Sequence, residues 1–198
     1  MKNLIALLLL LAVYGAVLAG PFEDGVAAYE SGDYATALRL NRSLAEQGQS
    51  TAQYNLGFMY DKGLGVPQDD AQAVTWYRKA AEQGLPLAQG NLGFMYDEGQ
   101  GVPQDDAQAV TWYRKAAEQG YPTAQYDLGI MYGKGRGVPQ DYVEAHKWAN
   151  LAAASATDAE TRDKATHNRD LIASKMTPAQ IAEAQKLARD WKPNTPTK

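Results

Sequence analysis

Apolar residues recur at helical spacing at the start of three related segments. In the first segment this apolar stripe comprises Ala52, Leu56, Met59 and Tyr60. Their spacing of i, i+4, i+7 and i+8 is typical of one buried face of an α-helix. Gly57 lies beside the stripe, where the missing side chain lets a neighbouring helix come close. The helix is predicted to end at Lys62 and Gly63, with the glycine as a left-handed cap.

A second helix follows a turn at residues 65–67. Asp69 precedes the next apolar run, and Gln72 follows it at the spacing of a capping box. The apolar face of this helix comprises Ala73, Trp76, Tyr77, Ala80 and Ala81, and Gly84 ends it. The segment therefore predicts a pair of helices joined by a turn.

The helix pair recurs with a period of 36 residues. Residues 87–122 repeat residues 51–86 with changes only at positions 51, 54, 62, 64 and 85 of the first copy, and residues 123–156 form a weaker third copy. Ala149 stands where the second copy has Tyr113, which indicates a different next neighbour. Such a period is typical of stacked repeats that bury their apolar faces against one another. The pattern predicts an all-α solenoid of antiparallel helix pairs.

The flanking residues predict atypical terminal units. Phe22, Val26 and Tyr29 lie on one face of a first helix in a divergent hairpin. Thr157 with Glu160, and Thr177 with Gln180, predict the capping boxes of two C-terminal capping helices. The predicted organisation is a signal peptide (1–19), an N-terminal hairpin (20–50), three repeats (51–86, 87–122 and 123–156), C-terminal capping helices (157–192) and a disordered tail (193–198).

The chain begins with a segment typical of a secretory leader. Lys2 precedes an apolar run over residues 4–13, and Val17 and Ala19 fit a small-residue cleavage pattern. The run is shorter than the ~20 residues that span a bilayer. We therefore predict an exported protein, periplasmic or secreted after cleavage. The alternative is an uncleaved leader that serves as a membrane anchor.

Composition narrows the class of partner. The chain has no cysteine, so its stability comes from packing without disulfides. Without Lys2 the mature chain carries 18 basic and 23 acidic residues, a net charge of −5. Nucleic acids and anionic membranes require a basic patch, and the sequence contains none.

The repeat resembles the Sel-one-like repeat (SLR), a relative of the tetratricopeptide repeat. The matching positions in the first copy are Ala52, Leu56, Gly57, Tyr60, Gly63, Gly65, Val66, Asp69, Ala73, Trp76, Tyr77, Lys79, Ala80, Ala81 and Gly84. The resemblance covers residues 51 to about 154. It implies a right-handed α-α superhelix with a concave groove for protein partners, and an adaptor role in processes such as secretion or envelope assembly.

The resemblance also leaves two alternatives to a protein-binding adaptor. Some exported relatives have a disulfide in each repeat and a penicillin-binding or lactam-hydrolysing activity, which implies a peptidoglycan- or lactam-directed hydrolase. This chain departs from the pattern of those relatives, because it has no cysteine. The other alternative is a scaffold within an exopolysaccharide or envelope export complex.

Candidate catalytic and metal-binding residues have simpler structural interpretations. Asp69 and Asp70, repeated at 105–106, could form a carboxylate pair, but the third copy keeps only Asp141 of the pair, as helix capping requires. His146 and His167 lack a second His or Cys at metal-ligand spacing and are interpreted as partly exposed helix residues. We therefore predict a monomeric protein without catalytic residues, metal or cofactor.

The first helix of each repeat supplies the candidate partner-binding surface. Trp76, Trp112 and Trp148 are assigned to the core. The opposite face of the first helices carries aromatic residues beside polar ones, a composition that suits an interface. The alternative is that Phe58 and Phe94 only pack against the next repeat. The predicted contact residues are Tyr54, Asn55, Phe58, Lys62, Asn91, Phe94, Glu98, Tyr126, Asp127, Ile130 and Lys134.

Overall fold

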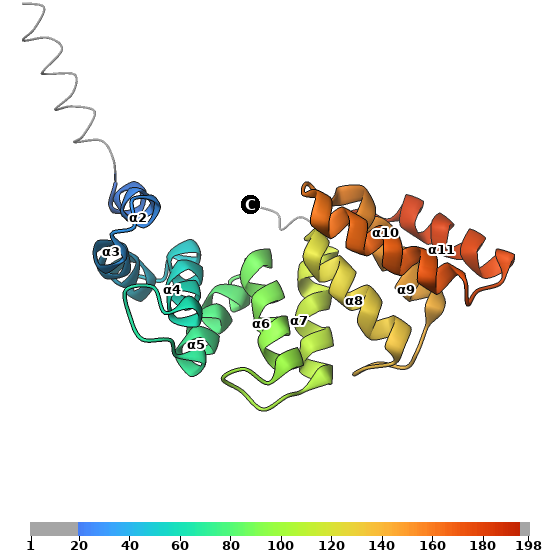
Figure 1. Ribbon diagram of the computed structural model, residues 1–198, viewed down its shortest axis with the longest axis horizontal. Helices are drawn as coiled ribbons and strands as arrows, with labels where there is room; N and C mark the ends of the chain where they lie inside the picture. The colour runs from blue at the N-terminus through green and yellow to red at the C-terminus, as the bar shows by residue number, and fades with distance from the viewer. Residues whose placement is uncertain (1–19, 195–198) are drawn as a thin grey trace, which may run out of the picture. The chain divides into compact units, whose positions relative to one another are not determined.

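The computed structural model describes residues 20–194 of the chain. The predicted signal peptide and residues 195–198 of the predicted tail lie outside this range. Within it all regular secondary structure is helical, which confirms the all-α prediction (Figure 1). The helices are α2 (Pro21–Glu30), α3 (Tyr34–Glu46), α4 (Ser50–Lys62), α5 (Asp70–Glu82), α6 (Pro86–Glu98), α7 (Asp106–Glu118), α8 (Pro122–Lys134), α9 (Tyr142–Ser155), α10 (Ala159–Ala173) and α11 (Pro178–Asp190).

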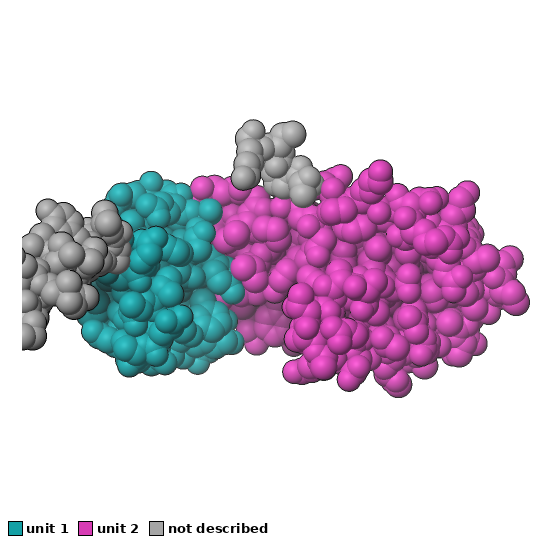
Figure 2. All heavy atoms as spheres, turned by 90° about the horizontal axis from the view of Figure 1, so that it is seen from above, with its two compact units in different colours: residues 1–76 teal, residues 77–198 magenta. Residues whose placement is uncertain are grey.

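The chain forms two compact units that divide inside α5, between Trp76 and Tyr77 (Figure 2). In the first unit α2 packs against α3, and α3 packs against α4. In the second unit α6 packs against α7, α7 against α8 and α8 against α9, while α10 and α11 both pack against α9. In most of these pairs a helix packs against the one before it in sequence, as stacked helix pairs require.

Local sequence signals set the helix ends. Three helices end at a glycine in the left-handed conformation: Gly63 (φ 65°), Gly99 (φ 68°) and Gly135 (φ 69°). This confirms the predicted cap at Gly63. The Oδ1 atom of Asp69 accepts a hydrogen bond from the backbone N of Gln72 at 2.9 Å, so Asp69 is the helix cap that the spacing predicted.

The apolar face predicted for the first helix is only partly buried. Val26 and Tyr29 are each 38 % exposed, whereas Gly25 and Ala28 are buried. The small side chains of α2 face α3, and this leaves the larger apolar ones on the open side of the helix. Phe22 is partly buried, because it packs against the cluster around Leu44.

One of the two predicted C-terminal capping boxes is also wrong. Asp158, not Thr157, caps α10, and its Oδ1 accepts from the backbone N of Thr161 at 2.7 Å. A carboxylate is a stronger acceptor than a hydroxyl for a helix N-terminus, which carries partial positive charge. The Thr177 and Gln180 box at α11 is confirmed, with both reciprocal hydrogen bonds formed.

The core of the second unit is built from aromatic and small residues. Tyr113 is fully buried between α7 and its neighbours, and its ring lies against Gly93 of α6. Trp112 and Trp148 are buried, as predicted for the core. The ring of Trp191, after α11, meets that of Trp148 edge to face at 6.1 Å, so the last helix covers the end of the repeat stack.

A buried glutamine joins each repeat to the one before it. Its Nε2 donates to a backbone oxygen near the end of the preceding helix at 3.1 Å in all three cases: Gln53 to Ala45, Gln89 to Ala81 and Gln125 to Ala117. The last carbonyls of a helix have no partner within that helix, so the amide satisfies one that burial would otherwise leave unpaired. The repeat pattern did not reveal this role, because a glutamine beside an apolar stripe is ordinarily exposed.

A second contact between repeats involves the loop after α8. The Arg136 guanidinium bonds to both oxygens of Asp106, with Nη2 to Oδ1 at 2.7 Å, and its Nη2 also contacts Asp97. The adjacent Gly137 has φ 66°, and a β-carbon there would lie 2.2 Å from the backbone oxygen of Asp106. The loop backbone therefore touches the first turn of α7 directly. In the first unit Gly65 makes the same kind of close approach: a β-carbon there would lie 2.6 Å from the backbone oxygen of Tyr34.

Candidate protein-interaction surface

The eleven residues predicted to contact a partner lie on three helices. Those on α4 belong to the first unit, and those on α6 and α8 belong to the second. The exposed ones are Lys62, Phe94, Glu98 and Lys134. The partly buried ones are Tyr54, Asn55, Phe58, Asn91, Tyr126, Asp127 and Ile130. A pocket in each unit brings some of them together.

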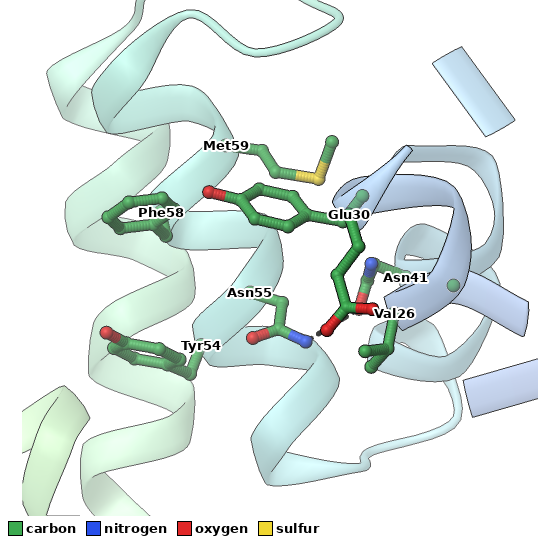
Figure 3. A pocket seen from close by; sticks show the side chains of 9 residues that line it. Val26, Glu30, Asn41, Tyr54, Asn55, Phe58 and Met59 are labelled. Atoms are coloured by element: carbon green, nitrogen blue, oxygen red, sulfur yellow. Dashed lines mark hydrogen bonds between the residues drawn. The ribbon is translucent and has the colours of Figure 1, made fainter. Parts of the chain in front are cut away.

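The pocket of the first unit lies between α2 and α4, with α3 behind it, and we call it the α2–α4 pocket. Its volume is about 330 Å³. Figure 3 shows Tyr54 and Phe58 of α4 on one side, Val26 and Asn41 on the other, and Asn55 between the two sides. The remaining lining residues are Gly25, Tyr29, Glu30 and Met59. Three of the four predicted residues on α4 therefore line a real concavity.

The first unit lacks a core tyrosine beside the α2–α4 pocket. Asn41 lies 36 residues before Tyr77 and 72 before Tyr113. A recurring contact supports this alignment of the N-terminal hairpin with the repeats. Arg42 Nη2 donates to Tyr60 Oη at 2.9 Å, just as Arg114, 72 residues later, donates to Tyr132 at 2.8 Å. The side chain at this position is thus much smaller than tyrosine, and it lines the pocket. The 36-residue offset alone could have revealed this substitution.

The polar groups of the α2–α4 pocket are largely engaged. Asn55 Nδ2 donates to Asn41 Oδ1 at 3.1 Å, and Asn41 Nδ2 donates to the backbone oxygen of Ala37 at 2.9 Å. These bonds hold the base of the pocket in place. Phe58 packs edge to face on Tyr29 with ring centroids 6.5 Å apart, and both rings keep part of their surface open. The pocket therefore has the two rings of Tyr29 and Phe58 at its opening, which we call the aromatic mouth, and a hydrogen-bonded polar base.

The pocket of the second unit lies between α6 and α8, and we call it the α6–α8 pocket. Its volume is about 160 Å³, and its walls include Asn91, Phe94, Tyr121 and Asp127. Tyr121 lies over Gly90, where a β-carbon would be 2.8 Å from the Tyr121 Cε1 atom. The first repeat has tyrosine and leucine in place of this glycine and tyrosine. Two of the five changes between the near-identical copies thus shape this pocket.

Asp127 has an altered acidity. Burial and, to a smaller extent, the nearby Asp97 carboxylate raise the pKa of its carboxyl to about 7, against the opposite effect of Lys164. No hydrogen bond or ion pair joins the Asp127 carboxylate to another of residues 20–194. Phe94, on the wall beside it, is 46 % exposed. An exposed aromatic ring therefore borders a carboxylate that has lost much of its hydration.

The acidic pairs have structural partners. Asp105 caps α7 through the backbone N of Gln108 at 3.0 Å, and the adjacent Asp106 binds Arg136. Across residues 20–194, no group of three or more His, Cys, Asp or Glu residues is placed to hold a metal ion. The interpretation of Asp69 and Asp105 as helix caps is confirmed by their hydrogen bonds.

The predicted partial exposure of His146 is wrong. His146 is buried on α9 at the position held by Val74 and Val110 in the other copies, and its Nδ1 has no hydrogen-bond partner among residues 20–194. Burial lowers the pKa of His146 below its usual value near 6.5, and the Arg169 guanidinium adds to the effect. The cause is the covering of α9 by α10, which the helical period of α9 alone does not reveal. His167 is exposed.

Replacing His146 by Val is expected to make the fold less sensitive to acid. With a lowered pKa in the folded state, His146 contributes stability that is present above pH 6.5 and is lost as the pH falls through the folded-state pKa. Thermal unfolding followed by circular dichroism at pH 7.5 and pH 5 should show a smaller loss of Tm for His146→Val than for the wild type. His167→Gln, at an exposed site on the adjacent helix, should leave the wild-type difference intact. Equal acid sensitivity of His146→Val and wild type would contradict the assignment.

Three consecutive stretches match the sequence profile of the Sel1 repeat: residues 50–85, 86–121 and 122–156. The chain belongs to the Sel1 repeat family. Sel1 repeats are typically scaffolds for protein–protein interaction and are generally non-catalytic. No protein of curated function matches the chain. Among residues 20–194 no helix is both long and apolar enough to cross a membrane.

Solved Sel1 repeat structures resemble this chain. A Sel1 repeat protein from Oxalobacter formigenes is 32 % identical, with a TM-score of 0.66, and the match covers 85 % of this chain and 74 % of that one. The protective antigen c5321 of uropathogenic Escherichia coli, which displays an SLR fold, is 35 % identical with a TM-score of 0.54. That match covers 79 % of this chain and 40 % of the antigen. The described helices thus follow the architecture of Sel1 repeat proteins.

Proposed function

We propose that this Sel1 repeat chain is a non-catalytic, monomeric adaptor that binds a protein or peptide partner in the α2–α4 pocket. The observation that carries the proposal is the open aromatic mouth of this pocket, formed by Tyr29 and Phe58, with the exposed Val26 beside it. Large apolar side chains that remain exposed around a concavity are characteristic of interaction sites, where burial by a partner removes them from water. The typical role of the repeat supports the same function.

The partner is expected to insert an apolar side chain between α2 and α4. The pocket base is already hydrogen-bonded through Asn41 and Asn55, so it offers few free polar groups to an incoming ligand. An aliphatic or aromatic side chain would contact Val26 and Phe58, while the exposed Glu30 carboxylate stands at the edge. The leader-like residues 1–19 support a location outside the cytoplasm, so the proposed partner is an envelope or secreted protein.

Removing the aromatic mouth is expected to abolish partner capture. In Tyr29→Ala with Phe58→Ala, capture of a specific protein from an envelope extract should fall at least tenfold, because each central aromatic contact typically contributes about 2 kcal/mol to binding. Mass spectrometry of the captured proteins measures the effect. Circular dichroism of the purified variant establishes that the helices persist.

A matched control removes an exposed apolar side chain elsewhere. Leu171→Ala on α10 changes a side chain that is 52 % exposed, and it should leave capture unchanged. A photo-crosslinking amino acid at position 26 should label the same partner, and one at position 171 should not. Undiminished capture by the folded aromatic variant would rule out the α2–α4 pocket as the interaction site.

A further inference from the structure

The third repeat has a carboxylate at a position of its first helix where the other two repeats have an amide. Asn55, Asn91 and Asp127 are separated by 36 residues each, so they occupy equivalent positions on α4, α6 and α8. Asn55 uses its amide to bind the base of the α2–α4 pocket. At the equivalent place in the α6–α8 pocket there is a carboxylate. The backbone geometry therefore accepts an amide here, and the chain carries a charge instead.

Lys164, the cation that acts on Asp127, is paired with another acid, and so is the cation beside Asp97. Lys164 Nζ lies 2.6 Å from Glu160 Oε1, and Arg136 binds Asp97 and Asp106. Asp97 acts on Asp127 only as a like charge that raises its pKa. A carboxylate that is partly buried without a hydrogen-bond donor is costly in the folded protein, and an incoming cation would relieve that cost.

The other walls of the α6–α8 pocket suit a long basic side chain. Phe94 presents an exposed ring that can cover an aliphatic stem or face a cation, and Asn91 adds an amide oxygen as acceptor. Tyr121 closes one side, because it occupies the space above Gly90. Lysine and arginine side chains combine an apolar stem with a charged end, which is the combination these walls offer.

We propose that the α6–α8 pocket binds an arginine or lysine side chain of a peptide partner, with its charged end on Asp127 and its stem along Phe94. The inference rests on the proposed role in protein binding and specifies the chemistry of the partner: a segment with a basic residue. A net negative charge of the mature chain favours the approach of such a segment.

Binding at this pocket should depend on pH. The cation binds the ionised carboxylate, and the pKa of Asp127 is about 7, so raising the pH from 6 to 8 should increase affinity about tenfold. Asp127 interacts electrostatically with titratable groups on four helices: Asp97 on α6, Tyr113 on α7, Tyr126 on α8 itself and Lys164 on α10. Over this pH range Asp127 is the group of the pocket that changes charge.

The test titrates ¹⁵N-labelled protein with N-acetyl-arginine amide and N-acetyl-lysine amide, monitored by NMR. The amide signals of Asn91, Phe94 and Asp127 should shift saturably with these probes. The neutral analogues N-acetyl-citrulline amide and N-acetyl-norleucine amide should produce no such shifts. Comparison of the two charged probes shows which side chain fits better.

Asp127→Asn is the matched variant, because Asn occupies the equivalent position in the other two repeats. It should weaken binding of the charged probes at least tenfold and remove the pH dependence. Phe94→Ala should weaken binding about two- to fivefold through the lost cation–π contact. Circular dichroism verifies that both variants remain folded.

Three outcomes would overturn the proposal: no saturable shifts, equal shifts with the neutral analogues, or unchanged affinity in Asp127→Asn. The titration needs no partner, so it can fail while partner capture through the α2–α4 pocket succeeds. Conversely, pH-dependent binding of the probes without any captured protein would support this pocket and count against the proposed adaptor role.

Discussion

Replacing Gly137 by Ala is expected to lower the free energy of unfolding by about 2 to 5 kcal/mol. Two effects contribute. Gly137 has φ 66°, where an L side chain is strained, and the new β-carbon would lie 2.2 Å from the backbone oxygen of Asp106. The atom in the way belongs to the first turn of α7, so no side-chain rotation can relieve the clash. Either the loop or the helix must move, and both movements break the contact between Arg136 and Asp106.

Gly135→Ala separates the two effects. Gly135 has a similar φ of 69°, but the nearest atoms to its β-carbon would be those of Gln140, at 3.2 Å and beyond. We expect a smaller cost of about 1 to 2 kcal/mol, mostly from the left-handed conformation. Urea unfolding followed by circular dichroism measures both variants. If they lose the same stability, the close approach of the loop to α7 does not matter energetically.

Replacing Tyr113 by Ala is expected to cost about 3 to 5 kcal/mol of unfolding free energy. The Tyr113 ring is fully buried and packs against Gly93 of α6, so truncation leaves a cavity that the neighbouring helices cannot easily close. Tyr113→Phe keeps the ring and should cost about 1 kcal/mol or less. Denaturant unfolding of the three proteins gives the comparison.

The partner of this ring allows a sharper test. A β-carbon at Gly93 would lie 2.7 Å from Tyr113 Cδ1, so Gly93→Ala should destabilise the wild type by about 1 to 2 kcal/mol. In the Tyr113→Ala background the same change should be stabilising, because the methyl group enters the cavity and alanine favours the helix. A change in the sign of this stability effect between the two backgrounds would establish that Gly93 is needed because the Tyr113 ring leaves no room for a β-carbon. The same destabilisation in both backgrounds would refute it.

The α2–α4 pocket illustrates how much of the candidate site the sequence could predict. Tyr54, Asn55 and Phe58 were expected at an interface because helical spacing places them opposite the apolar stripe of α4, and all three line the pocket. The opposite wall includes Val26 and Tyr29, which the sequence placed on one apolar face of the first helix but did not connect with this site. Hydrophobicity indicates that a side chain prefers burial, but it does not tell whether a neighbour is present to bury it.

His146 and Asp127 show the same limit for chemical properties. Each is a single substitution in an otherwise regular repeat, and each was assigned from its own helix alone. The pKa of His146 is lowered because α10 covers it, and the pKa of Asp127 is raised by burial and by Asp97 on another helix. Electrostatic effects of this kind depend on groups that the chain brings together from distant positions.

The sequence by itself determined the helical repeat, its period and most helix ends. These follow from interactions within a few residues: the capping bonds of Asp69, the left-handed conformation at Gly63 and the spacing of apolar side chains on one helix face. The tertiary structure alone decided which apolar residues of α2 stay open, where Gln125 is buried, and how Arg136 and Gly137 fit against α7. Those features depend on how one helix pair meets the next, because burial, steric fit and charge interactions are properties of neighbours in space.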